Sequence, residues 1–99
     1  MILEAELEDP GRQAPDPGAL YVIGIMRYRV LRVVEGDYPH EHAYVGHHRA
    51  DLSQPEFQPG ARHRLTVTRE FPAGATLLNT FDVGAEGVLY CTSFELISV

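Results

Sequence analysis

The segment from Leu20 to Glu35 constrains the fold more than any other part of the chain. It is rich in valine, isoleucine and tyrosine and is followed by a glycine-containing turn, which predicts a β-strand. Strands are usually about five or six residues long. We therefore expect this one to bend, with Gly24 marking a bend, and to contribute to both faces of a curled sheet.

The alternation within this segment breaks at Arg32. Residues 26, 28 and 30 share one face of an extended chain, and Arg32 would fall on the same face as Tyr28 and Val30. One extra residue in a strand moves every later side chain to the opposite face. The break therefore predicts a β-bulge near Val30 or Leu31.

The other strand predictions come from segments that alternate between apolar and polar residues. They are Met1–Glu8, His42–Arg49, Arg62–Arg69 and Val88–Val99, with a short extra strand at Thr76–Leu78. The side chains expected to face inward are Leu3, Ala5, Leu7, His63, Leu65 and Val67. In the segment 42–49 the alternation sets Ala43, Val45 and His47 against Tyr44, Gly46 and His48. In the last segment the alternation sets residues 90, 92, 94 and 96 against 89, 91, 93, 95 and 97. The first segment could also form a short helix on propensity, but it lacks a cap.

Five strands in a chain of 99 residues, the second one long and bent, predict a single domain spanning residues 1–99. The expected fold is all-β, a five- to six-stranded Greek-key barrel of the oligonucleotide/oligosaccharide-binding (OB) type, because closure removes exposed strand edges. A β-sandwich is the alternative, although an immunoglobulin-like one needs about seven strands.

Composition excludes several classes of protein. The 44% hydrophobic and 22% charged residues are typical of a globular chain, and no apolar run approaches the length of a membrane span. The single cysteine, Cys91, excludes an internal disulfide and a cysteine-only zinc site. Met1 is followed by alternating glutamates rather than a signal peptide, which favours the cytoplasm. The alternative is a periplasmic domain cut from a longer exported chain.

The net charge of −6 hides a basic middle region. Every basic residue is an arginine, and residues 21–69 contain seven of the eight arginines and all five histidines. A net acidic chain is a poor candidate for non-specific nucleic-acid binding. A local basic patch can still hold a small anion or an acidic polymer.

Arginines supply the main candidate site. Two project from one side of the long strand and two from one side of a later strand, and a tyrosine could accompany them: Arg27, Arg29, Arg62, Arg64 and Tyr44, with Tyr28 as the other candidate ring. Guanidinium groups bind carboxylate or phosphate, and aromatic rings stack on bases or sugars. The alternative is that these arginines pair with the N-terminal glutamates and only solubilise the sheet.

Histidines suggest a second, weaker candidate. His40, His42 and His48 share one face of an extended strand, and His47 and His63 lie near by in sequence or on a neighbouring strand. This spacing matches no standard zinc motif, so we predict no metal site and no cofactor. Ser53, Ser93 and Cys91 lack the sequence context of an activated nucleophile, so we expect no enzymatic activity.

A family resemblance supports the barrel. It rests on the strand and turn Tyr28-Arg29-Val30-Leu31-Arg32-Val33-Val34-Glu35-Gly36-Asp37-Tyr38, then Ala43-Tyr44-Val45, and later Pro59-Gly60 before Leu65-Thr66-Val67. This order resembles netrin-like, tissue-inhibitor-type OB domains. It is also similar to small β-modules beside bacterial cell-envelope hydrolase-like proteins involved in alginate acetylation. The disulfides of the secreted animal domains are absent from this chain. The resemblance implies an accessory or binding role and transfers no catalytic residue.

These observations favour a non-enzymatic binding or accessory module. Its expected partner is an anionic polysaccharide or a protein surface, with single-stranded nucleic acid ranked lower and no membrane insertion. The alternative is a protein-interaction or structural domain that self-associates as a homodimer through an edge strand such as Met1–Leu7. A small histidine-based metalloprotein ranks third.

Overall fold

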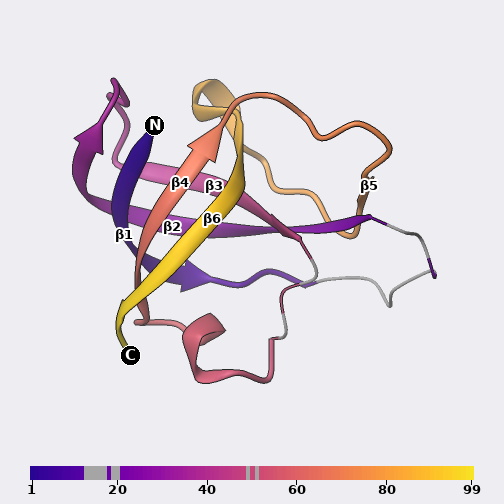
Figure 1. Ribbon diagram of the computed structural model, residues 1–99, viewed down its shortest axis with the longest axis horizontal. Coiled ribbons are helices and arrows are strands. Elements are labelled where there is room, and N and C mark those ends of the chain that lie inside the picture. The colour runs from indigo at the N-terminus through magenta and orange to yellow at the C-terminus, as the bar shows by residue number, and fades with distance from the viewer. Residues whose placement is uncertain (13–17, 19–20, 49, 51) are drawn as a thin grey trace.

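A computed structural model describes residues 1–12, 18, 21–48, 50 and 52–99 (Figure 1). Its strands are β1 (Ile2–Asp9), β2 (Val22–Glu35), β3 (His42–His48), β4 (Arg62–Thr68), β5 (Thr76–Leu77) and β6 (Val88–Ser98). Two single-turn 3₁₀ helices accompany them, η1 (Pro55–Phe57) and η2 (Gly84–Glu86). The described residues contain no helix with the length and hydropathy of a membrane span. Leu20 and Arg49, at the ends of two predicted strands, lie outside the described residues.

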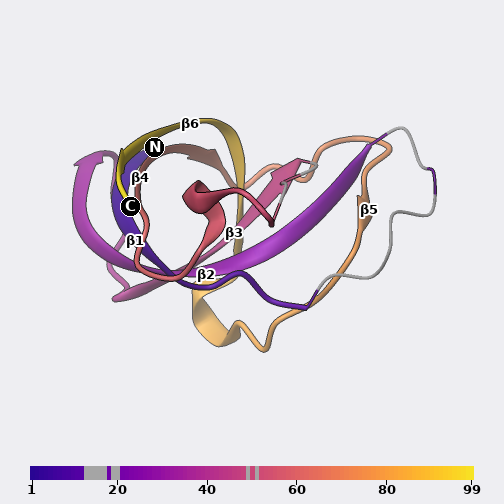
Figure 2. The ribbon, with the colours of Figure 1, turned by 90° about the horizontal axis from the view of Figure 1, so that it is seen from below.

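The predicted all-β fold is confirmed. The six strands form one sheet in the order β1-β4-β6-β3-β2-β5, and an additional pairing between β1 and β2 closes five of them into a ring. Figure 2 shows this ring end-on, with η1 lying across one mouth. The arrangement is compatible with an OB-like barrel or with a sandwich.

β1 is a strand rather than a helix, and it lies inside the sheet. Leu3, Ala5 and Leu7 are fully buried, as their alternation with glutamates predicts. β1 pairs antiparallel with β2 on one side and with β4 on the other. The expectation that Met1–Leu7 offers a free edge for self-association is therefore wrong.

β2 contains the predicted bulge. Ala5 of β1 pairs with Val30, and the next residue back, Glu4, pairs with Arg32, so Leu31 is the extra residue. The bulge returns Arg32 to the outer face of the barrel, beside the other arginines of β2. A second register shift leaves Val34 unmatched as well. Both bulged side chains are exposed.

The first half of β2 is buried on both faces. All five residues of the run 22–26 are buried. The segment between β4 and β6 runs along the free edge of this part of β2, where β5 pairs with it in parallel. There the Asn79 side chain accepts a hydrogen bond from the Ile25 N–H at 2.6 Å and donates one to the Ile25 carbonyl at 2.8 Å. The amide of Asn79 thus acts as a one-residue strand partner.

β6 differs from the prediction in its alternation. Val67 of β4 pairs with Cys91 and Leu65 pairs with Phe94, although the two β4 residues are two apart and the two β6 residues are three apart. A bulge at Thr92 and Ser93 therefore puts Cys91 and Phe94 on the same inner face, where simple alternation separates them. Leu96, opposite the buried His63, shares that face.

Candidate functional site

The barrel wall opens between β3 and β6. These strands pair in parallel only where Tyr44–Gly46 meets Val88–Tyr90. Beyond Tyr90, β6 keeps β4 as its neighbour, and among the described residues no strand pairs with its other edge. The short helix η1 lies across this end of the barrel (Figure 2). The opening exposes inner-face side chains that a continuous wall would cover.

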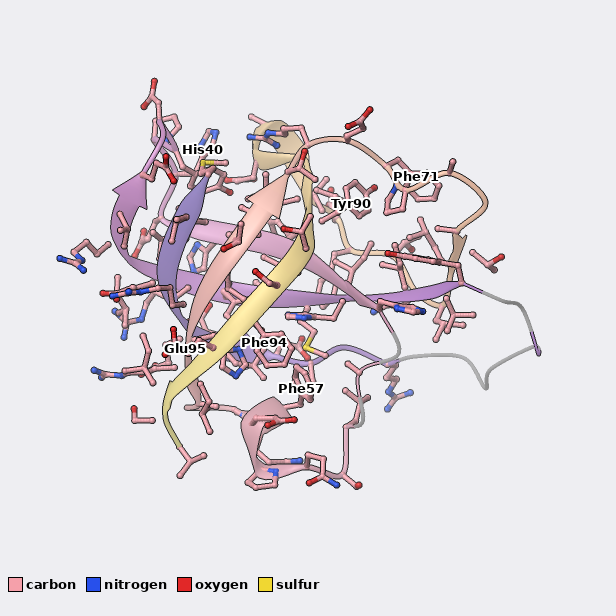
Figure 3. The ribbon with its side chains drawn as sticks, viewed as in Figure 1. His40, Phe57, Phe71, Tyr90, Phe94 and Glu95 are labelled. Atoms are coloured by element: carbon pink, nitrogen blue, oxygen red, sulfur yellow. The ribbon has the colours of Figure 1, made fainter. Side chains whose placement is uncertain are left out.

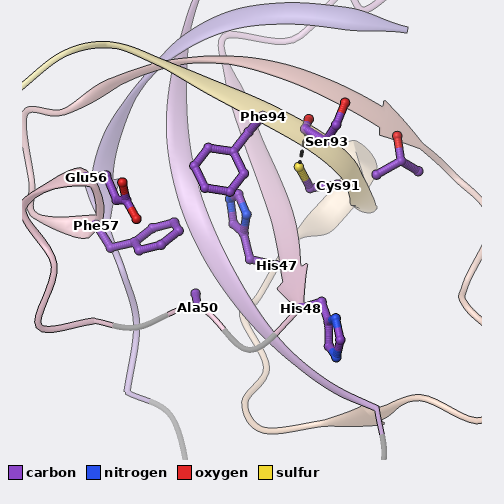
Figure 4. A pocket seen from close by; sticks show the side chains of 9 residues that line it. His47, His48, Ala50, Glu56, Phe57, Cys91, Ser93 and Phe94 are labelled. Carbon is purple, nitrogen blue, oxygen red and sulfur yellow. Dashed lines mark hydrogen bonds between the residues drawn. The ribbon is translucent and has the colours of Figure 1, made fainter.

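A pocket of about 500 Å³ occupies this opening (Figure 4). β3 contributes His47 and His48, η1 contributes Glu56 and Phe57, and β6 contributes one wall. The full lining is His47, His48, Ala50, Glu56, Phe57, Cys91, Thr92, Ser93 and Phe94. The volume falls within the range of about 300–1,000 Å³ that is typical of small-molecule sites.

Aromatic rings form the inner wall of the pocket. The Phe94 ring lies 5.5 Å from that of Phe57 and 5.3 Å from that of His47, centroid to centroid. Phe57 and His47 are buried, whereas Phe94 stays 41% exposed. Figure 3 shows Phe57 and Phe94 near each other, and Figure 4 shows both with His47, gathered from η1, β6 and β3. An inner-face phenyl ring with this exposure indicates an apolar surface that the described part of the chain does not cover.

Behind this wall, the hydroxyl of Tyr28 joins two buried histidines. Its Oη lies 2.8 Å from Nε2 of His47 and 2.8 Å from Nδ1 of His63. The hydroxyl carries one proton, so it donates to one imidazole and accepts an N–H from the other. This chain of hydrogen bonds fixes both rings and lets β3, β2 and β4 share a polar group inside an apolar core.

All three members of the chain are neutral near pH 7. Burial, together with a smaller effect of the neighbouring His63, lowers the pKa of His47 from 6.5 to about 3. Burial also lowers the pKa of His63, and this outweighs the opposing effects of the Glu56 backbone and carboxylate. The pKa of Tyr28 is raised well above its ordinary value by burial.

Cys91 lies on the β6 side of the pocket as a protonated thiol. Burial raises its pKa to about 11, and the thiol contacts the Ser93 carbonyl at 3.2 Å. The thiolate is the nucleophilic form of cysteine. At neutral pH this side chain therefore offers shape and polarisability rather than reactivity.

The structure brings the four predicted arginines onto one outer face, but β1 separates them. Arg27 and Arg29 lie on β2 and Arg62 and Arg64 on β4, with β1 between the two strands. The glutamates of β1 bridge them. Arg29 and Arg62 lie 3.4 and 3.2 Å from Glu6. The remaining pairs are Arg32 and Arg64 with Glu4 at 3.1 and 2.6 Å, and Arg27 with Glu8 at 3.5 Å.

The arginines also lower the pKa values of their carboxylate partners. Hydrogen bonds from Arg64 and Arg32 lower the pKa of Glu4, and bonds from Arg29 and Arg62 lower that of Glu6. The arrangement matches the alternative in which the arginines pair with the N-terminal glutamates. Tyr44, the fifth residue of the predicted site, pairs with Arg27 across the strands, and its ring packs on Phe81 at 5.6 Å.

The five histidines do not gather at one site. His47 and His63 meet at Tyr28, whereas His42 pairs with Glu8 at 3.2 Å. His48 stacks on Tyr21, and His40 packs edge-on against Tyr38. Within the described part of the chain, no group of three or more histidine, cysteine, aspartate or glutamate side chains is placed to hold a metal ion.

The pocket was not among the sequence predictions. Its parts carried a signal: His63 was predicted to face inward, and alternation put Tyr28 and His47 on faces that they share with apolar residues. Polar rings at such positions suggest a hydrogen-bond network. Their convergence depends on which strands are neighbours. Phe94 gave no such signal because the bulge at Thr92 changes its face.

In comparisons with known proteins, no family model, curated protein or solved structure matches the chain.

Proposed function

We propose that this protein is a non-enzymatic binding module whose ligand enters the pocket between β3, η1 and β6. One observation carries the proposal. Phe94 lies on the inner face of the barrel yet stays exposed, beside a buried histidine and a pocket of about 500 Å³. A ligand ring placed against Phe94 would bury apolar surface that the barrel itself leaves open.

The lining favours a neutral, planar ligand group with one hydrogen-bonding atom. Two phenyl rings and the Cys91 thiol provide apolar contact, and Thr92, Ser93 and His48 add polar atoms at the rim. The described lining residues include the carboxylate of Glu56 and no arginine. Aromatic rings pair in offset or edge-on geometry at centroid separations of about 4.5–7 Å.

Binding rather than catalysis agrees with the chemistry of the lining. With a pKa of about 3, His47 is too weak a base to take a proton from a substrate efficiently at neutral pH. The Cys91 thiol, with a pKa of about 11, is protonated there. The resemblance to OB-type accessory modules of bacterial cell-envelope proteins implies the same class of role.

The test is an amide-resolved NMR titration with p-cresol, the side-chain analogue of tyrosine. We expect shifts centred on residues 91–94 and on His47, weakened at least severalfold in Phe94→Ala. Phe71→Ala is the matched control, because Phe71 is similarly exposed (45%) but packs on Tyr90, away from the pocket. Shifts that scatter over the surface, or that survive Phe94→Ala unchanged, would refute the site.

An anionic polymer on the arginine face is the second candidate. Among the described residues of that face, five arginines share the three glutamates of β1, so the guanidinium groups are in excess. Glu6→Gln removes the shared partner of Arg29 and Arg62. If the face binds anions, this variant elutes later than wild type from a heparin column in low salt, and the difference disappears as salt is raised. Equal elution of both proteins argues against it.

A further inference from the structure

We propose that the ligand is an extended peptide segment that pairs with the free edge of β6 and inserts an aromatic side chain into the pocket. The proposal rests on the pocket assigned above and adds the class of ligand. Strand addition to an open sheet edge is an established mode of peptide recognition. Four observations point to it here.

The first observation is the open edge itself. From Cys91 to Ser98, β6 pairs with β4 on one side, and no strand of the described chain pairs with its other side. Backbone N–H and C=O groups in a sheet need partners, and an open edge is a template for another strand. Lysine and proline, which commonly protect such edges, are absent from residues 91–98.

The second observation is the place of the pocket. It lies along residues 91–94 of β6, with β3 and η1 on its far side. Because β3 stops pairing with β6 at Tyr90, the pocket begins where the next strand of the ring would continue. A peptide backbone at β6 can therefore direct a side chain into the pocket, against the exposed side of the Phe94 ring.

The third observation limits the length of the pairing. Bulges interrupt β6 at Thr92 and again at Ile97. Between them, residues 93–96 form a short regular stretch, in which Phe94 and Leu96 face inward and are 41% and 40% exposed. A bulge disrupts regular hydrogen bonding. The peptide therefore engages a few residues and relies on its anchor side chain.

The fourth observation concerns charge. Glu56 on η1 contributes a carboxylate to the pocket lining, and no arginine of the described lining accompanies it. A basic residue beside the aromatic anchor complements this carboxylate. A second copy of this chain fits less well, because the charged residue of its own β6 is the acidic Glu95. Like charges brought together disfavour association.

The probe is the blocked peptide acetyl-Lys-Val-Tyr-Val-Thr-amide, titrated into the full chain and followed by amide-resolved NMR. Shifts are expected along residues 91–98 together with the pocket. Two further peptides keep every side chain and differ in which amides are N-methylated: the two valine amides in one, the tyrosine and threonine amides in the other. Amides in a strand point alternately to opposite sides. One peptide is therefore expected to bind about tenfold more weakly and the other nearly as well as the parent.

The outcomes separate this proposal from the function proposed above. Equal affinity of the two N-methylated peptides, with p-cresol still shifting residues 91–94, overturns strand pairing and leaves the pocket intact. Failure of both p-cresol and the peptide overturns both proposals. Replacing the lysine of the probe by glutamate should weaken binding severalfold, and unchanged affinity contradicts the role of Glu56. A free protein that sediments as a dimer with residues 91–98 protected makes a second copy the occupant instead.

Discussion

Tyr28 lets the barrel interior hold two histidines. His47 and His63 are both buried, and a buried imidazole without a partner costs free energy. The single hydroxyl of Tyr28 serves both rings at 2.8 Å. Alternation predicts that His63 faces inward and that Tyr28 and His47 share faces with apolar residues. It does not predict their contact, because that requires β4 to lie across the ring from the paired strands β2 and β3.

Removing that hydroxyl is the simplest test of the network. We expect Tyr28→Phe to lower the free energy of unfolding by about 1–3 kcal/mol, because it leaves two buried ring nitrogens without their partner. Urea denaturation followed by circular dichroism measures the change. Tyr44→Phe, on the outer face of β3, serves as the control and should stay within about 0.5 kcal/mol of wild type. Equal losses in the two variants would argue against a special role for Tyr28.

The buried histidines also predict how stability depends on pH. In the unfolded chain a histidine takes up a proton below about pH 6.5, whereas folded His47 stays neutral down to a pKa of about 3. The unfolded state therefore binds more protons, and the free energy of unfolding falls as pH drops through this window, by up to about 1.4 kcal/mol per unit for the one group. His63 acts in the same direction.

The carboxylates of Glu4 and Glu6 affect stability in a lower pH range than the buried histidines do. Glu4 and Glu6 have pKa values lowered from 4.5 by their arginine partners, so their contribution is lost only below that value. Urea denaturation between pH 7 and 5 therefore isolates the histidines. His47→Gln keeps a hydrogen-bonding side chain without a titrating group and should reduce the slope. An unchanged slope in this variant would show that His47 is not responsible.

At the scale of the strands, bulges decide how well the sequence predicts the sheet. The bulge at Leu31 was predictable because Arg32 would otherwise enter an apolar face. The bulge at Thr92 left a comparable trace, because simple alternation puts Glu95 on the same face as Leu89 and Cys91. It was harder to recognise than the first, since β6 carries apolar side chains at both parities. Sequence patterns therefore located the strands and most inward residues, but they put Cys91 and Phe94 on opposite faces.

Gly46 shows how closely β3 approaches its neighbours just before the wall opens. A Cβ atom at this position would lie 2.6 Å from Cγ2 of Ile23 and 3.0 Å from Cδ1 of Tyr90. Ile23 is buried and cannot move freely. We expect Gly46→Ala to lower the free energy of unfolding by about 1–3 kcal/mol through overpacking. A variant that unfolds at the same urea concentration as wild type would contradict this packing.

At the scale of the molecule, strand order separates the two candidate surfaces. It places β1 between the arginine-bearing strands, so that their charges pair with glutamates, and it leaves the second edge of β6 without a strand beyond Tyr90. Composition and alternation predicted an all-β domain and the direction of most side chains. Neither could predict strand order, because pairing between distant segments is a tertiary property, and the pocket follows from that order.

Amide hydrogen exchange in the free protein shows whether the barrel is open between β3 and β6. Amides of β1 should be protected along the strand, since β1 pairs on both sides. From Cys91 to Ser98, amides directed to β4 should be protected and those directed to the open edge should exchange rapidly. Uniform protection across residues 91–98 would contradict an open barrel, because it requires a partner for the edge of β6 that the structure leaves unpaired.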